Sequence, residues 1–129
     1  MLTLQKFWLL LGWLLIFSVC YLSVTASPPD FGMTFEYSDK LKHVFAYFVL
    51  MGWFAQIYKT TYGRLFYVLF FVLMGVTLEI IQGLGQARYF EYADMLANAT
   101  GVALAWLATQ GSLKDILLNL ERVTRAQEE

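Results

Sequence analysis

Residues 7–25 read FWLLLGWLLIFSVCYLSVT, a stretch without a charged residue. At a rise of about 1.5 Å per residue, a helix over this stretch is long enough to cross the roughly 30 Å hydrocarbon core of a bilayer. Three further apolar stretches follow, at residues 41–58, 65–81 and 94–110. A proline pair, a short basic turn and a glycine-rich loop separate the four stretches. The pattern predicts four transmembrane helices joined by short connections.

The composition also indicates a membrane protein. Of the 129 residues, 59% are apolar and 15% are charged, whereas soluble proteins are about 25% charged. So few charges cannot cover a surface that faces water, and lipid must therefore surround much of the chain. We predict an all-α, polytopic membrane protein, with a four-helix transmembrane domain over residues 1–110 and a separate tail over residues 111–129.

The basic residues predict how the helices are oriented. Short loops that carry Lys and Arg stay on the cytoplasmic side of a membrane. One side of the predicted bundle has Lys6, Lys59, Arg64, Lys114, Arg122 and Arg125, whereas the other has Lys40, Lys42 and Arg88. We therefore expect both termini to be cytoplasmic. The start of residues 41–58, the end of residues 65–81 and the start of residues 94–110 then lie at the outer leaflet.

The cytoplasmic tail is expected to form an amphipathic helix. Apolar residues recur there at helical spacing, opposite charged and polar ones, and the apolar set is Leu113, Ile116, Leu117, Leu120 and Val123. A helix of this kind typically lies in the headgroup region of a membrane. We expect it to anchor the C-terminal end of the chain at the surface.

The stretch at residues 7–25 has a second interpretation. It follows Lys6, and Val24 and Ala26 are small residues at the spacing of a signal-peptidase site. The segment is long for the apolar part of a signal peptide, which favours a transmembrane helix. The sequence leaves open whether the segment is retained or cleaved.

Charge and cysteine content exclude some classes of function. The net charge is -1 and no basic stripe is present, so a nucleic-acid partner is not expected. Cys20 is the single cysteine, which excludes a disulfide within the chain and a cysteine metal site. We expect Cys20 to behave as a small apolar residue.

Polar residues interrupt the apolar stretches near the ends that we assign to the outer leaflet. They are Asp39, His43, Glu79, Gln82, Asp94 and Asn98. Asp39 and His43 are one helical turn apart, as are Asp94 and Asn98, so each pair shares a helix face. A carboxylate inside a membrane costs about 2.5–3.5 kcal/mol on insertion scales, so Glu79 needs water or a partner. Candidate partners are Arg88, His43 and Lys40.

The same residues have a purely structural interpretation. Asp39 and Asp94 open helices, where a carboxylate interacts favourably with the helix dipole. Asn98 can hydrogen-bond between helices without binding a ligand. However, three helices that contribute acids, amides and a histidine at one level favour a functional site.

These residues resemble the pattern of the VanZ-like family, membrane proteins named after an accessory protein of teicoplanin resistance. The matching motifs are Asp39-Lys40-x-x-His43 followed by Ala46-Tyr47, Glu79-Ile80-x-Gln82, Arg88, and Asp94-x-x-x-Asn98-x-x-Gly101. The resemblance covers about residues 38–105. It implies a multi-pass protein of the bacterial inner membrane, and the founding member of the family lowers susceptibility to teicoplanin.

Our preferred hypothesis is a binding site for a membrane lipid or a cell-wall precursor, without catalysis. Lys40 and Arg88 would engage phosphate or carboxylate groups, and Glu79, Asp94 and Asn98 would accept hydrogen bonds from amines or hydroxyls. The full predicted ligand-binding set is Asp39, Lys40, His43, Glu79, Gln82, Arg88, Asp94 and Asn98, and no metal or cofactor is expected.

The alternative is a membrane enzyme that modifies such a lipid. His43 would be the general base, oriented by Asp39, with Glu79 as the acid, or these three residues would hold a divalent metal. No motif that pairs a nucleophile with a base accompanies them, and Asp-x-x-x-His is a weak ligand pattern. The sequence does not decide whether the chain is an enzyme, nor its oligomeric state.

Overall fold

The computed structural model describes residues 2–25, 38–84, 92–111 and 113–129. In these residues the fold is all-helical, without a β-strand. The helices are α1 (Gln5–Val24), α2 (Ser38–Ile57), α3 (Thr61–Leu84), α4 (Tyr92–Ala108) and α5 (Ile116–Glu128). The prediction of an all-α fold is confirmed, and each predicted stretch overlaps one of these helices.

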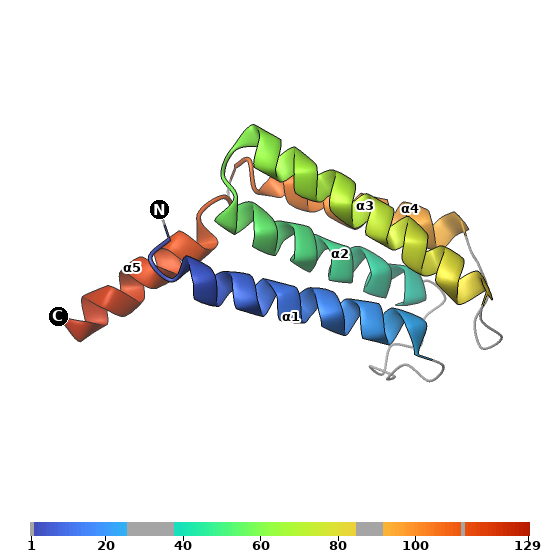
Figure 1. Ribbon diagram of the computed structural model, residues 1–129. Helices are drawn as coiled ribbons and strands as arrows, with labels where there is room; N and C mark the ends of the chain where they lie inside the picture. The colour runs from blue at the N-terminus through green and yellow to red at the C-terminus, as the bar shows by residue number, and fades with distance from the viewer. Residues whose placement is uncertain (1, 26–37, 85–91, 112) are drawn as a thin grey trace.

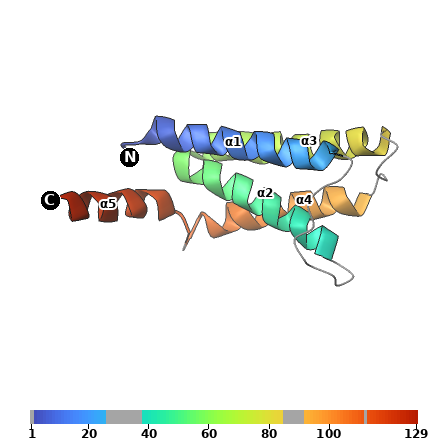
Figure 2. The same cartoon turned by 90° about the horizontal axis from the view of Figure 1, so that it is seen from below.

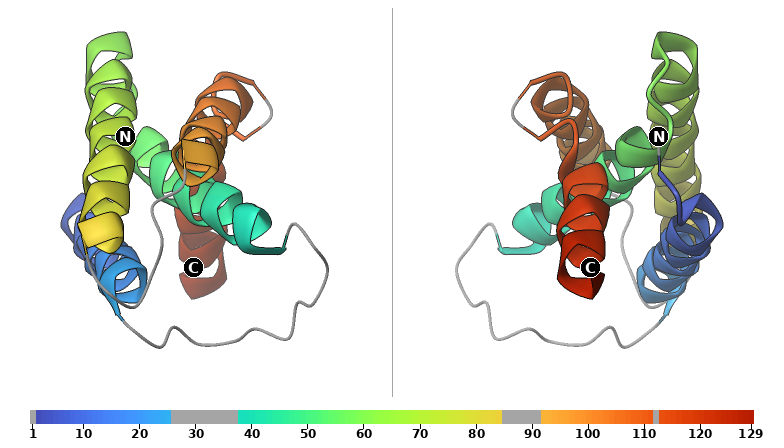
Figure 3. Two further views of the ribbon diagram at one scale, coloured as in Figure 1. Left: turned by 90° about the vertical axis from the view of Figure 1, so that its right-hand side faces the viewer. Right: turned by 90° about the vertical axis from the view of Figure 1, so that its left-hand side faces the viewer.

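Helices α1 to α4 lie alongside one another as an up-and-down bundle, and α5 extends away from one end of it (Figure 1). After a quarter turn, α1 and α3 are seen as one layer and α2 and α4 as the other (Figure 2). The central helix is α2, which packs against each of the other four and most extensively against α4. Viewed along the bundle, α2 crosses obliquely between the α1–α3 pair and α4 (Figure 3).

The up-and-down connectivity brings four helix ends together. The end of α1, the start of α2, the end of α3 and the start of α4 lie at the same end of the bundle, on the right in Figure 1. The N-terminus and α5 lie at the opposite end. The polar residues of α2, α3 and α4 therefore share one end of the bundle, as the sequence analysis expects.

The interior of the bundle is apolar and rich in aromatic rings. Its buried cluster draws on α1 to α4 and consists of Ile16, Tyr47, Leu50, Met51, Phe54, Ala55, Phe71, Val102 and Ala105. The Phe54 ring stacks on Tyr67 with 4.7 Å between centroids and meets Phe71 edge-on at 5.5 Å. At Gly12 of α1, a Cβ atom would lie 2.9 Å from the Trp53 ring, so α1 is closely fitted to α2.

The connection between α2 and α3 is shorter than predicted, because α3 begins at Thr61 rather than near residue 65. The Thr60 hydroxyl accepts a hydrogen bond from the Gly63 amide at 3.1 Å and so caps the start of α3. The Arg64 guanidinium donates to the carbonyl of Ala55 at 2.9 Å and to that of Tyr58 at 3.2 Å. These bonds satisfy carbonyl groups at the end of α2 that have no partner within the helix.

The end of α3 also differs from the prediction. Gly83, which we expected in a loop, lies inside α3, and the helix ends at Leu84. Gly83 and Leu84 are exposed, whereas Gln82 is buried and hydrogen-bonds to the Ser23 carbonyl, so this contact holds the last turn despite the cost of about 1 kcal/mol for a helical glycine.

Two of the described helices, α1 and α3, are long and apolar enough to cross a membrane. The first turns of α2 carry Asp39, Lys40 and Lys42, and α4 has 17 residues. A helix of that length extends about 26 Å, less than the roughly 30 Å hydrocarbon core. Two of the four predicted spans therefore meet the criterion of length and composition, and a four-span topology stays a prediction.

Candidate functional site

The first turns of α2 and α4 supply the polar side chains of the candidate site. Asp39 lies in the first turn of α2 and Asp94 in the first turn of α4. A carboxylate at such a position is stabilised by the partial positive charge of a helix N-terminus. The two helix starts therefore stabilise two neighbouring carboxylates at the same end of the bundle.

Close packing between α2 and α4 holds these two helix starts together. A Cβ atom at Gly101 would lie 2.3 Å from the carbonyl oxygen of Val44 and 3.0 Å from the amide nitrogen of Phe48. The backbones can approach to this distance only because Gly101 has no side chain. On α3, a Cβ atom at Gly75 would lie 3.0 Å from Nδ2 of Asn98, so Gly75 leaves room for the Asn98 side chain.

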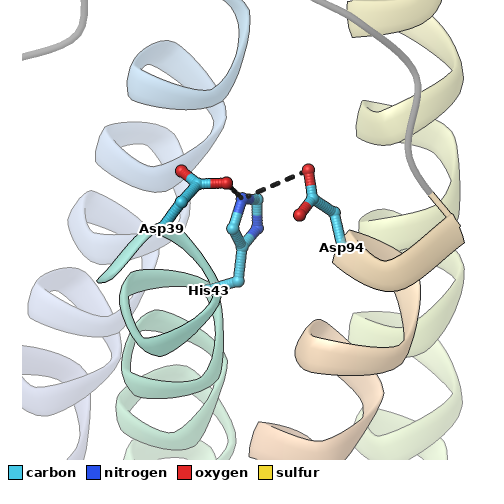
Figure 4. Close-up of side chains that lie close together, drawn as sticks. All are labelled: Asp39, His43 and Asp94. Atoms are coloured by element: carbon cyan, nitrogen blue, oxygen red, sulfur yellow. Dashed lines mark ion pairs between the residues drawn. The ribbon is translucent and has the colours of Figure 1, made fainter. Parts of the chain in front are cut away.

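His43 is the centre of the site (Figure 4). Its Nδ1 lies 2.9 Å from Oδ1 of Asn98. Its Nε2 lies 3.7 Å from Oδ2 of Asp39 and 3.6 Å from Oδ2 of Asp94. The Lys40 ammonium donates a hydrogen bond to Oδ1 of Asp94 and lies 3.6 Å from Oδ2 of Asp39. These five residues, Asp39, Lys40, His43, Asp94 and Asn98, are called the α2–α4 cluster below.

Exposure changes across the α2–α4 cluster. Asp94 and Asn98 are 5% and 3% exposed. The side chain of His43 is 17% exposed and that of Asp39 is 65% exposed. The cluster is therefore closed by protein on the Asn98 side and open on the Asp39 side, where a small molecule or a lipid head can reach it.

The formal charges of the α2–α4 cluster do not cancel. Asp39 and Asp94 contribute two negative charges and Lys40 contributes one positive charge, which leaves one negative charge when His43 is neutral. Such a site attracts cations and hydrogen-bond donors. The Lys40 ammonium is the one group of the cluster suited to an anionic ligand.

Two predicted site residues, Glu79 and Gln82, lie on α3 outside the α2–α4 cluster. Gln82 is buried and donates a hydrogen bond to the carbonyl of Ser23, so it joins the end of α3 to the end of α1. Glu79 is 1% exposed and close enough to the Tyr47 hydroxyl to interact with it electrostatically. Tyr47 is one turn beyond His43 on α2, so Glu79 lies deeper in the bundle than the cluster.

The potential metal ligands among the described residues differ from those that the sequence suggested. The ligand atoms of Asp39, His43 and Asp94 lie within 4.8 Å of one another. Asp94 therefore takes the position that the sequence analysis assigned to Glu79. Arg88, the remaining predicted site residue, lies outside the described residues.

A buried carboxylate at the opposite end of the bundle was missed. Glu121, assigned to the polar face of the tail helix, is 4% exposed. It accepts hydrogen bonds from the amides of Thr3 at 2.8 Å and Leu4 at 2.9 Å, and from the Trp8 indole at 2.7 Å. Burial raises the pKa of Glu121, but these bonds outweigh it and lower the pKa to about 2. Glu121 follows the apolar Leu117 by four residues, so the two share a helix face. This spacing could have indicated that Glu121 is buried.

A second set of contacts joins the end of α2 to the connection before α5. The buried Gln56 donates to the carbonyl of Leu113 and accepts from the Leu117 amide at 3.3 Å. Lys59 pairs with Asp115 at 2.9 Å, and its hydrogen bond lowers the pKa of Asp115. These contacts position α5 and do not belong to the α2–α4 cluster.

Comparisons with models of known protein families, with curated proteins and with solved structures found no match for this chain. The resemblance to the VanZ-like family rests on the sequence motifs alone and stays a prediction. The function is therefore inferred from the geometry of the site.

Proposed function

We propose that this chain is a four-span protein of a bacterial inner membrane that binds the polar head of an envelope lipid or a cell-wall intermediate at its outer face. The observation that supports the proposal is the convergence of Asp39, His43, Asp94 and Asn98 at one open end of a bundle with an apolar surface. Through the family resemblance, the proposal extends to an effect on teicoplanin susceptibility.

The exposed apolar surface supports a lipid environment. Only 17% of the apolar window of α1 and 33% of that of α3 is buried. The exposed large side chains of these helices include Phe7, Leu10, Trp13, Leu14, Phe17, Tyr21, Leu65, Phe66, Leu69 and Leu73. Monomeric soluble proteins rarely expose contiguous apolar patches of more than about 300–600 Å². Lipid tails are the natural cover for such a surface.

The distribution of basic residues supports an outward-facing site. Lys59 lies in the turn between α2 and α3 and Arg64 in the first turn of α3, at the end of the bundle opposite the α2–α4 cluster. Lys114 follows α4 at that same end. Basic residues in short connections favour the cytoplasmic side, so both termini would be cytoplasmic and the cluster would face outward.

The side chains of the α2–α4 cluster suit a head group that carries both donors and an anionic group. The carboxylates of Asp39 and Asp94 accept hydrogen bonds from an amine or hydroxyl. The Lys40 ammonium, which contacts both carboxylates, can turn toward a phosphate or carboxylate of the same ligand. Arg88, as predicted from the sequence, would add a second cation.

Catalysis by His43 is supported less well than binding. A general-base histidine usually has its orienting carboxylate on one ring nitrogen and the reacting group on the other. Here Asn98 occupies Nδ1, and both Asp39 and Asp94 lie beside Nε2. Within the described part of the chain, the recorded partners of His43 include no hydroxyl or thiol that it could activate. Binding is therefore the better-supported function.

The test uses a host strain that lacks the protein, complemented with single variants. Lys40→Met and Asp94→Asn each remove a charged group that would hydrogen-bond to the lipid head. We expect each change to weaken lipid adducts in native mass spectrometry about tenfold or more. Teicoplanin susceptibility should change in parallel. The control is Arg122→Gln, an exposed change on α5 at the opposite end of the chain. Adducts that persist unchanged in both site variants would reject the proposal.

A further inference from the structure

His43 directs one ring nitrogen, Nε2, toward two carboxylates. Because Oδ1 of Asn98 only accepts, Nδ1 of His43 is the donor at 2.9 Å, and Nε2 of the neutral ring therefore has a free lone pair. That lone pair lies 3.7 Å from Oδ2 of Asp39 and 3.6 Å from Oδ2 of Asp94. A cation between these three atoms, either a proton on Nε2 or a bound metal ion, is attracted by both carboxylates.

The Lys40 ammonium does not fill this position. It hydrogen-bonds to Oδ1 of Asp94, the other oxygen of that carboxylate, and lies 3.6 Å from Oδ2 of Asp39, while Oδ2 of Asp94 faces His43. The space between Nε2 and the two Oδ2 atoms is therefore bounded by three potential ligand atoms (Figure 4).

The distances are close to those of a metal centre. In a tetrahedral site with bonds of about 2.0–2.2 Å, neighbouring ligand atoms are roughly 3.4 Å apart. The distances from His43 to the two carboxylates, 3.6 and 3.7 Å, exceed this by a few tenths of an ångström. All three ligand atoms lie within 4.8 Å of one another. The side chain of Asp39 is 65% exposed, so it can rotate to close the remaining distance.

We propose that Asp39, His43 and Asp94 bind one divalent transition-metal ion, with Zn²⁺ preferred, through Nε2 and one oxygen of each carboxylate. Asn98 is a positioning residue, because its hydrogen bond to Nδ1 directs Nε2 toward the ion. The imidazole ligand favours Zn²⁺ over Mg²⁺ and Ca²⁺, which prefer oxygen. Lys40 competes with the ion for Asp94, because both are cations on the same carboxylate.

The metal site is an addition to the proposed lipid binding. A bound ion would also increase the affinity of the site for an anionic head group. Three protein ligands leave at least one coordination position open for an oxygen of a bound molecule. A divalent ion would also change the formal charge of the α2–α4 cluster from one negative to one positive. A phosphate or carboxylate head group would then be attracted to the site.

The experiment titrates Zn²⁺ into untagged, full-length protein in detergent, without added lipid, after removal of metal with a chelator. We expect one Zn²⁺ per chain by calorimetry and elemental analysis. Asp39→Asn and His43→Gln should each weaken binding about tenfold or more. Lys40→Met should strengthen it several-fold, because a competing cation is removed. Arg122→Gln, far from the site on α5, should leave the affinity unchanged.

Absence of stoichiometric Zn²⁺, or affinities of Asp39→Asn and His43→Gln equal to that of the original chain, would overturn the proposal. Thermal melting shows whether each variant is folded. If His43→Gln does not fold, Asp39→Asn still tests the proposal, because the exposed Asp39 side chain is not needed for packing. Zn²⁺ binding without a lipid adduct would retain this inference and reject the proposed function. Lipid binding without Zn²⁺ binding would reject the metal site and retain the proposed function.

Discussion

At the scale of single residues, the distance between α2 and α4 depends on Gly101. A Cβ atom there would lie 2.3 Å from the Val44 carbonyl oxygen, so Gly101→Ala must move the two helices apart. We expect a loss of about 1–3 kcal/mol in the free energy of unfolding, the usual cost of an overpacked interface. Denaturant unfolding in detergent measures it. Because Asp94 and Asn98 lie on the same helix, Zn²⁺ and lipid binding should weaken as well.

Gly52→Ala is the matched control for Gly101→Ala. Gly52 lies inside α2, and a Cβ atom there would meet the Ala105 side chain at 4.0 Å, an ordinary contact. Alanine has a higher helix propensity, so we expect no loss of stability and a gain of up to about 1 kcal/mol. Equal destabilisation by the two changes would show that the Gly101 contact does not set the helix separation.

At the scale of elements, α5 is held to the start of α1 by Glu121. The carboxylate accepts from two backbone amides and the Trp8 indole, and it lies beside the apolar contact of Trp8 with Leu117. Glu121→Gln removes the charge from these bonds, and we expect α5 docking to weaken by about 2 kcal/mol. The Trp8 indole N–H signal in an NMR spectrum reports the docked state. Glu128→Gln, exposed on the same helix, should leave that signal unchanged.

The same carboxylate predicts a pH dependence of α5 docking. The pKa of Glu121 falls from an ordinary value of 4.5 to about 2 in the folded chain. The ionised form therefore stabilises docking fully above pH 4.5, and this stabilisation is lost as the pH falls through about 2. The Trp8 indole signal should stay constant down to about pH 5 and shift only below it. A shift that is complete near pH 6 would contradict this assignment.

At the scale of the whole molecule, the topology depends on whether α4 crosses the membrane. With 17 residues, α4 is shorter than α1 and α3, which meet the criterion for a membrane span. Ala93 lies in the first turn of α4 and Gln110 two residues beyond its last residue, and both are exposed. In a Cys20→Ala background, we expect Ala93→Cys to react with a membrane-impermeant reagent from outside the cell. Gln110→Cys should react only after permeabilisation, and equal labelling of both positions in intact cells would reject the four-span topology.

The agreement between sequence and structure follows from local physics. Helices α1 to α4 were predicted from runs of apolar residues and α5 from its amphipathic pattern, and the bounds of α3 differ from the prediction at both ends. The Thr60 cap accompanies a start of α3 one turn earlier than predicted, and Gly83 continues the helix at its end. The sequence also predicted that the polar residues lie at one end of the bundle. In antiparallel helices that follow one another in the chain, the end of one helix lies beside the start of the next.

The sequence alone determined the helices, the faces on which their polar residues lie and the end of the bundle that those residues share. Only the tertiary structure decided which side chains meet: Asp94 with His43, Gln82 with the end of α1, and Glu121 with the N-terminal amides. The physical reason is that periodicity sets a residue's position on its own helix, whereas its partner depends on how closely two helices pack. Here that distance is set by the contact of Gly101 with the backbone of α2.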